Sequence, residues 1–155
     1  MLQDLLPAAK ERLVDARAVL THGSPTGSIY LAGYSVEMVL KHAALRVDRV
    51  SLTAPPKAAA AVTRARLKAE VGEVEPEHYH SLRFWALILR AAWRSRRGVV
   101  PEIVNEAVSK AERLYQGWMV DMRYRSMMIA PKDAMEFFRH ASWFVSHAAE
   151  LARER

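Results

Sequence analysis

The segment 29–41, IYLAGYSVEMVLK, constrains the fold most strongly, because at helical spacing it presents apolar side chains on several sides at once. One stripe holds Ile29, Gly33, Val36, Leu40 and Ala43, a second holds Leu31, Met38 and Leu45, and a third holds Tyr30, Tyr34, Glu37 and Lys41. A helix that is apolar on so many sides belongs in the middle of a helical protein. The sequence therefore predicts a central helix that runs to about Arg46, with Ala32 and Gly33 thin enough for a neighbour to come close.

The remainder of the chain also has helical periodicity. Further helices are expected over residues 2–20, 79–96, 101–118 and from Asp133 onward, with a short peripheral helix over 58–71. Clusters of glycine, proline and serine separate them, and Thr26 or Ser28 is expected to cap the central helix. No alternating pattern of useful length indicates a strand. The predicted fold is all-α, an antiparallel up-and-down bundle of four or five helices in one domain, residues 1–155.

Composition narrows the class of protein. The chain of 155 residues is 51% hydrophobic and 26% charged, which is typical of a globular domain. No uncharged apolar run reaches the roughly 18 residues that a membrane span needs, and the charged first residues are unlike a secretory signal. Cysteine is absent, which excludes disulfides and thiolate metal sites. We therefore expect a cytoplasmic protein without a membrane partner, whose net charge of +6 modestly favours an anionic partner.

Glu37 and Lys41 stand one helical turn apart inside the central helix. On an exposed helix such a pair would contribute a few tenths of a kcal/mol, about 0.2–0.5. A buried carboxylate instead needs a partner, because leaving it unpaired is too costly. Arg123, which precedes the last predicted helix, is the expected partner of Glu37 across the bundle. A structural ion pair is the simpler interpretation, and a catalytic pair is the alternative.

A basic face is predicted on the helix at 79–96. The arginines that share this face are Arg83, Arg90, Arg94 and Arg97. Arg96 lies beside them, and Trp85 and Trp93 are interleaved with them. Guanidinium groups in a row can bind phosphates, and tryptophan can stack on a base, so this is a possible nucleic-acid face. The simpler interpretation, which we favour, is a solvated helix face with both tryptophans turned to the core.

The histidines indicate no metal site. His78 and His80 lack a third ligand and are interpreted as surface residues at the start of a helix. His140 and His147 are two turns apart, too far to share one ion without a ligand between them. The motifs HExxH, GxGxxG, GxSxG and the phosphate-binding P-loop are all missing. The sequence therefore predicts no metal and no cofactor, and identifies no catalytic residue.

The central segment 30–45, YLAGYSVEMVLKHAAL, resembles the corresponding helix of HEPN-domain proteins. The resemblance continues at His80-Ser81-Leu82, where the family often has a His-x-Leu segment opening the third helix. It continues again at 118–124, WMVDMRY, which is similar to the family's Arg-Tyr segment before the last helix. The order, the spacing and the helical pattern agree over most of the chain.

This resemblance implies an up-and-down bundle that pairs into a homodimer. Many members of this family are metal-independent ribonucleases, in which four to six residues separate an Arg from the His that follows it. Many are prokaryotic toxins encoded beside a minimal nucleotidyltransferase, as part of a toxin–antitoxin pair, whereas others have lost catalysis and serve as binding or assembly modules. This sequence departs from the pattern, because Met128, Ile129 and Ala130 occupy the positions after Arg123 where the His is wanted. Its one literal match, Arg17 to His22, falls at the end of the first helix.

The resulting expectation is a catalytically degenerate HEPN-like protein that binds a nucleotide, RNA or a nucleotidyltransferase-type partner protein. The residues expected to line its inter-helix dimer cleft are Glu37, Lys41, Arg123 and Tyr124. One alternative is a metal-independent ribonuclease toxin, in which His80 or His140 approaches Arg123 in space and supplies the missing acid–base group. The other alternative is an interaction scaffold that binds no ligand.

Overall fold

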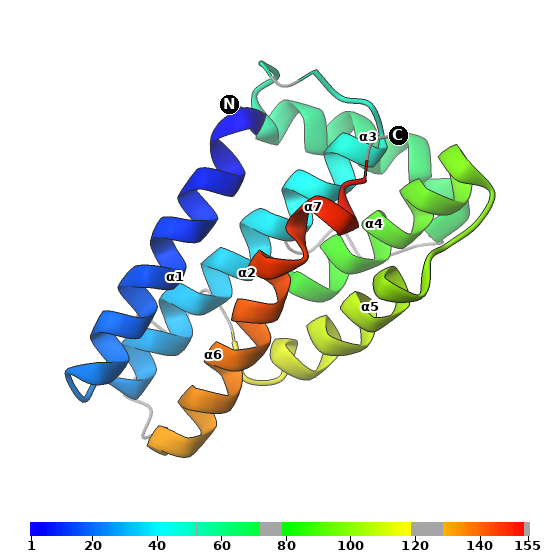
Figure 1. Cartoon of the computed structure of the whole chain (residues 1–155). Helices are drawn as coiled ribbons and strands as arrows, with labels where there is room; N and C mark the ends of the chain where they lie inside the picture. The colour runs from blue at the N-terminus through cyan, green and yellow to red at the C-terminus, as the bar shows by residue number, and fades with distance from the viewer. Residues whose placement is uncertain (52, 72–78, 119–128, 154–155) are drawn as a thin grey trace.

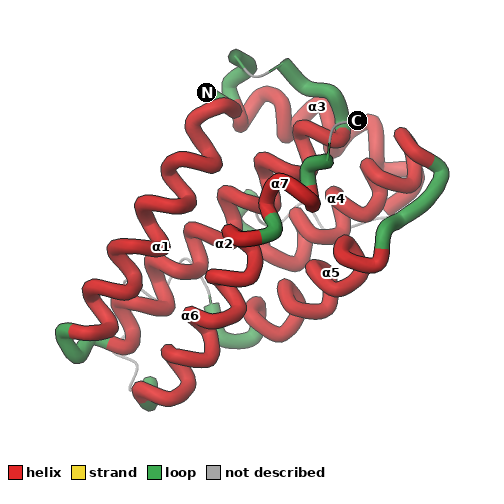
Figure 2. The backbone as a smooth tube through the Cα atoms, viewed as in Figure 1, coloured by secondary structure: helices red, strands yellow, loops and turns green. Residues whose placement is uncertain are grey.

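The computed structural model describes residues 1–51, 53–71, 79–118 and 129–153, and all regular structure within these ranges is helical (Figures 1 and 2). The elements are η1 (Leu2–Asp4), α1 (Leu5–Thr21), α2 (Pro25–Val47), α3 (Pro56–Val71), α4 (Leu82–Arg97), α5 (Glu102–Tyr115), α6 (Pro131–Ser146) and α7 (Ala148–Leu151). The predicted all-α class is confirmed. Among the described residues, none of the helices has both the length and the apolar composition that crossing a membrane requires.

α2 is the central element, as its apolar stripes predict. It packs against α1, α4 and α6, and also meets α3 and α7 (Figure 1). More than half of its residues are buried, including Glu37 and Lys41. The predicted cap was wrong: the helix begins at Pro25, with Ser24 as N-cap, and so includes both Thr26 and Ser28. Proline is well suited to the first position of a helix, because the N–H that it lacks would have no partner there.

The boundaries of α4 determine where the preceding residues lie. The helix begins at Leu82, three residues later than predicted, because the Ser81 hydroxyl accepts the Phe84 N–H at 3.1 Å and caps the first turn. It ends at Gly98, whose φ of 72° is in the left-handed region that glycine adopts readily. Tyr79 and His80 therefore precede α4, and their side chains contact residues of α2.

The core lies between α2 and the helices around it. The residues after α3 that contribute to it, all buried, include Leu82, Trp85, Leu89, Ala92, Ala107, Ala111, Leu114, Trp118, Phe137, Ala141, Phe144, Ala148 and Leu151. Ile103 is only half-buried. Trp118 lies beyond the last turn of α5 rather than within it. The last long helix begins at Pro131 instead of Asp133, and α3 begins at Pro56, slightly earlier than predicted.

Candidate functional site

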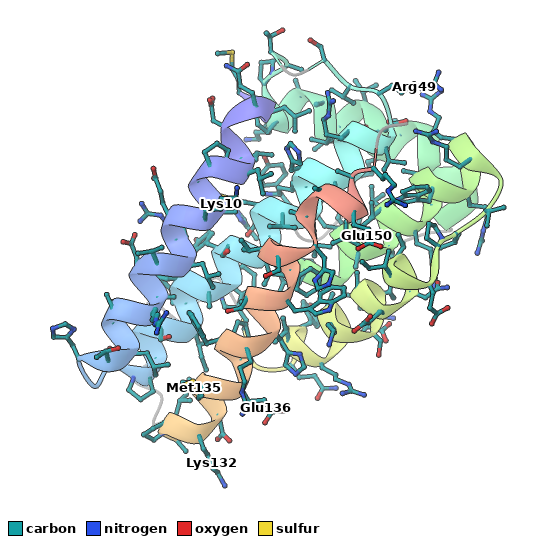
Figure 3. All side chains as sticks on the ribbon, in the orientation of Figure 1. Lys10, Arg49, Lys132, Met135, Glu136 and Glu150 are labelled. Carbon is teal, nitrogen blue, oxygen red and sulfur yellow. The ribbon has the colours of Figure 1, made fainter. Side chains whose placement is uncertain are left out.

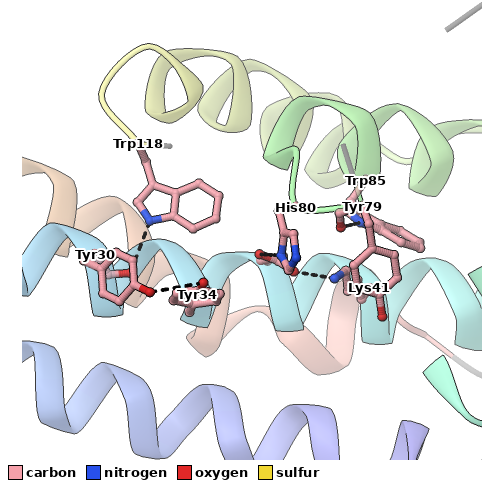
Figure 4. Close-up of polar contacts among 8 residues, drawn as sticks. Tyr30, Tyr34, Lys41, Tyr79, His80, Trp85 and Trp118 are labelled. Atoms are coloured by element: carbon pink, nitrogen blue, oxygen red, sulfur yellow. Dashed lines mark hydrogen bonds and ion pairs between the residues drawn. The ribbon is translucent and has the colours of Figure 1, made fainter. Parts of the chain in front are cut away.

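Glu37 is a buried carboxylate with two partners. Glu37 lies on α2 and is 3% exposed. Lys41, one turn further along the same helix, donates a hydrogen bond to Oε1 of Glu37. Nδ1 of His80, 43 residues later in the chain, lies 3.1 Å from Oε1 and 3.2 Å from Oε2 (Figure 4). The carboxylate is thus held from two directions, by its own helix and by the segment before α4.

The partner predicted for Glu37 was Arg123. Arg123 and Tyr124 both lie outside the described residues, so their place in the cleft stays a prediction. The contact with His80 was missed, because His80 was interpreted as a surface histidine at the start of a helix. The sequence feature that indicates where His80 lies is Ser81. Serine is a preferred N-cap residue, so it places His80 just before the helix and not within it.

The contact with Glu37 fixes the tautomer of His80. A carboxylate oxygen only accepts, so Nδ1 carries the proton that is donated to Glu37. The other ring nitrogen, Nε2, is then the one that can meet a ligand. The His80 side chain is 44% exposed, whereas that of Glu37 is 4% exposed. A histidine oriented by a buried carboxylate in this way can accept a proton, donate one or bind an anion.

Lys41 is the buried cation of the site. Its ammonium lies 3.3 Å from the centroid of the Tyr79 ring and 5.5 Å from that of Trp85 (Figure 4). Burial lowers the pKa of Lys41 below its ordinary value of 10.5, and the neighbouring Glu37 opposes that shift. Burial and Glu37 both raise the pKa of Tyr79 above 10.0. Lys41 therefore acts as the internal counter-ion of Glu37, covered by an aromatic ring.

A row of aromatic side chains continues from His80 along α2. Tyr34 meets His80 edge to face, with ring centroids 6.3 Å apart, and meets Trp118 in the same way at 5.5 Å. The Tyr30 hydroxyl donates to that of Tyr34 at 3.3 Å, and the Trp118 indole N–H donates to the Tyr30 carbonyl at 3.2 Å (Figure 4). Tyr30 and Tyr34 are half-buried, so this row presents ring surface beside the histidine.

Gly33 allows Trp118 to reach this row. A Cβ placed on Gly33 would overlap the five-membered ring of the indole, which lies directly against the helix backbone. The prediction that Ala32 and Gly33 keep α2 thin for a close neighbour is confirmed at Gly33. The neighbour is Trp118, which is 1% exposed.

Gly33→Ala is expected to lower the free energy of unfolding by about 2 kcal/mol, because a tightly packed site must open to admit the methyl group. Chemical denaturation with near-UV circular dichroism would measure the loss and the movement of the indole. Gly117→Ala is the matched control, since a Cβ there would meet its nearest neighbour at an ordinary 3.8 Å. Equal stabilities for the two variants would contradict the close packing of Trp118 on Gly33.

The predicted basic face of α4 is present in part. Arg83, Arg94 and Arg97 are exposed and Arg90 is half-buried. Both tryptophans turn to the core, as the favoured interpretation held, and their indole N–H groups donate to the carbonyls of Tyr79 and Leu151 respectively. Base stacking on Trp85 is therefore excluded in this conformation, and any contact of this face with phosphates would depend on the arginines.

Two further histidines, His140 and His147, lie on α6 and at its C-terminal end. His140 on α6 is 3.9 Å from Glu136, and burial together with nearby Lys110 lowers its pKa. His147 stacks on Trp143 with ring centroids 4.6 Å apart. Across the ranges that the structure describes, no group of three potential ligands is arranged to hold a metal ion. The Glu37–His80 pair is therefore the strongest candidate for chemistry.

Comparisons with protein-family models, with curated proteins and with solved structures gave no match for this chain.

Proposed function

We propose that this chain is a HEPN-like protein, an up-and-down helical bundle that acts in the cytoplasm as a homodimer and binds RNA or a nucleotide around Glu37 and His80. The observation that carries the proposal is the half-exposed imidazole of His80, held through Nδ1 by a buried carboxylate. This arrangement leaves Nε2 directed away from Glu37, where it can meet a phosphate oxygen.

The surroundings of His80 suit such a ligand. Tyr34 and Tyr79 flank the imidazole at centroid distances of 6.3 and 5.3 Å, and both are half-buried. Partly exposed aromatic rings beside a cationic or hydrogen-bonding group are the usual components of single-stranded nucleic-acid sites. The net charge of +6 adds long-range attraction for phosphates. A nucleotidyltransferase-type protein remains a further proposed partner, resting on the HEPN resemblance.

Binding is proposed ahead of catalysis for a chemical reason. Cleavage of RNA without a metal needs groups that move protons and a cation that stabilises the developing charge. His80 can move a proton, but Lys41 is turned toward Glu37 and covered by Tyr79, so it cannot reach a phosphate beside Nε2. The second candidate function is a metal-independent ribonuclease, which is favoured by the carboxylate-oriented histidine and would depend on Arg123 for the missing cation.

The proposal is tested by replacing His80 with asparagine and measuring RNA binding. The asparagine amide can take the place of Nδ1–H toward Glu37 but leaves no group at the position of Nε2. We expect His80→Asn to keep its melting temperature within a few degrees and to lose about tenfold in affinity for a fluorescein-labelled 12-nucleotide RNA, or 1.4 kcal/mol. Fluorescence anisotropy at fixed salt would measure the affinity.

His22→Asn is the matched control, since His22 is an exposed histidine whose Nδ1 contacts the Ala18 carbonyl in the last turn before it. Unchanged RNA affinity in His80→Asn would overturn the proposed site. If the wild-type protein binds neither the RNA nor ADP, the scaffold function replaces the proposal. Cleavage of the RNA in EDTA by the wild type but not by His80→Asn would establish the ribonuclease.

A further inference from the structure

A pocket lies where α4, α5 and α7 meet. Its volume is about 450 Å³, within the range of small-molecule sites. The residues that line it are Trp93, Arg97, Val99, Pro101, Ile103, Glu150 and Arg153. Figure 3 shows Glu150 leaving α7 on the side of α4 and α5. None of these residues belongs to the Glu37–His80 site.

The floor of the pocket is apolar. Trp93 is 8% exposed and fixed by its indole N–H, which donates to the Leu151 carbonyl at 3.0 Å. Val99 is 70% exposed, the highest value among the exposed large apolar side chains of the described residues. Pro101 and Ile103 are half-buried and complete this surface. An apolar body bound here would cover Val99 and stabilise the complex by removing that surface from water.

The rim carries two guanidinium groups. Arg97 lies across the Trp93 ring, 5.8 Å from its centroid, and donates to the Arg153 carbonyl at 3.5 Å. Within the part of the chain that the structure describes, neither Arg97 nor Arg153 forms an ion pair. Glu150 is the one acidic residue of the lining, so the rim has one net positive charge.

We propose that this pocket binds a small amphipathic carboxylate, a molecule with a single negative charge and an apolar body. The apolar body lies against Trp93, Pro101 and Ile103, and the carboxylate meets the guanidinium groups of Arg97 and Arg153. Arginine suits this contact because its planar fork can bind a carboxylate through two parallel hydrogen bonds. The single net charge of the rim selects a monoanion over a polyanion such as RNA. This inference is independent of the function proposed for the Glu37–His80 site.

The test uses octanoate as the probe, below its micelle concentration, with the full-length ¹⁵N-labelled protein. We expect saturable movement of the Trp93 indole N–H signal in NMR spectra, because this group lies in the pocket floor. Uncharged 1-octanol is the matched probe and is expected to bind at least fivefold more weakly. Equal affinities for the two probes, or octanoate-dependent shifts that leave the Trp93 signal in place, would overturn the proposal.

Three substitutions test the charge selection. Arg97→Gln and Arg153→Gln are each expected to weaken octanoate binding about fivefold, and Glu150→Gln is expected to strengthen it about twofold, as partly exposed ion pairs allow. Arg94→Gln is the control, since Arg94 is exposed in the same last turn of α4 but does not line the pocket. All four side chains are exposed, so these variants are expected to fold. Unchanged affinity in both arginine variants would show that the carboxylate is not bound by the rim.

Discussion

Glu37→Leu is expected to lower the free energy of unfolding by about 4 kcal/mol, the largest effect of any single substitution considered for this protein. The substitution leaves the Lys41 ammonium buried without its carboxylate, beside the aromatic rings of Tyr79 and Trp85. An uncompensated buried charge is far more destabilising than the loss of the pair as a whole. Urea denaturation followed by circular dichroism would measure the change.

Combining Glu37→Leu with Lys41→Met is expected to recover most of the lost stability. Leucine and methionine approximate the two side chains in size, and replacing both members of a buried ion pair by apolar groups is often close to neutral. The double variant nevertheless removes the acceptor that holds Nδ1 of His80. We therefore expect it to fold well and still to bind the 12-nucleotide RNA about tenfold more weakly than the wild type.

The dependence on pH provides a second measurement on the same pair of variants. Glu37 raises the pKa of Lys41, so its removal leaves burial free to lower that pKa further below 10.5. Between the folded pKa and 10.5, the unfolded chain binds more protons than the folded one, so stability rises with pH. Glu37→Leu should thus gain stability as the pH is raised toward 10.5, and the double variant should lack this gain.

Two results would contradict this account of Glu37. If Glu37→Leu lowered the free energy of unfolding by less than about 1 kcal/mol, the pair would behave as an exposed one. Water would then reach the carboxylate and Lys41. RNA binding at wild-type strength in the recovered double variant would mean that Glu37 does not position His80 for a ligand. The first result concerns the buried pair alone, whereas the second concerns the proposed site.

The central helix could be predicted from sequence because several of its sides are apolar, and burial of Glu37 and Lys41 followed from their place in it. The helix starts were less predictable, since they depend on local capping. Pro25 and Ser81 each compete with neighbouring residues that have similar preferences. The contact between Glu37 and His80 spans 43 residues, and no periodicity encodes a contact of that range. Sequence reasoning therefore identified the buried carboxylate and its neighbour Lys41 but missed His80, and the contact predicted with Arg123 stays a prediction.

Asp48 forms a second buried polar contact, which ties the end of α2 to α3 and α4. Its side chain is 4% exposed and accepts the Thr63 hydroxyl at 2.7 Å. Arg96 donates to Oδ1 of Asp48 through Nε at 3.2 Å and through a terminal nitrogen at 3.1 Å. The next residue, Arg49, has a φ of 62°, a left-handed conformation that is uncommon outside glycine. These contacts hold the chain where it turns away from the central helix.

Asp48→Ala is expected to lower the free energy of unfolding by about 3 kcal/mol, because the buried Thr63 hydroxyl loses its acceptor and Arg96 loses its carboxylate. The effect stays below that of Glu37→Leu, since the Arg96 side chain is 35% exposed and water can solvate it. Asp48→Asn keeps one acceptor oxygen for Thr63 and should lose about half as much. Thermal and urea denaturation would rank the stabilities of the wild type, Asp48→Asn and Asp48→Ala.

Asp15→Asn is the matched control for Asp48, because it removes the same charge from a pair that water already reaches. Arg12 and Asp15 approach to 2.9 Å with side chains 42% and 46% exposed, so the expected loss is below about 0.5 kcal/mol. If Asp48→Ala and Asp15→Asn were equally stable, the contact of Asp48 with α3 and α4 would contribute nothing beyond a surface pair. A large loss confined to Asp48 would show that burial and the Thr63 hydroxyl, rather than charge alone, make this residue hold three helices together.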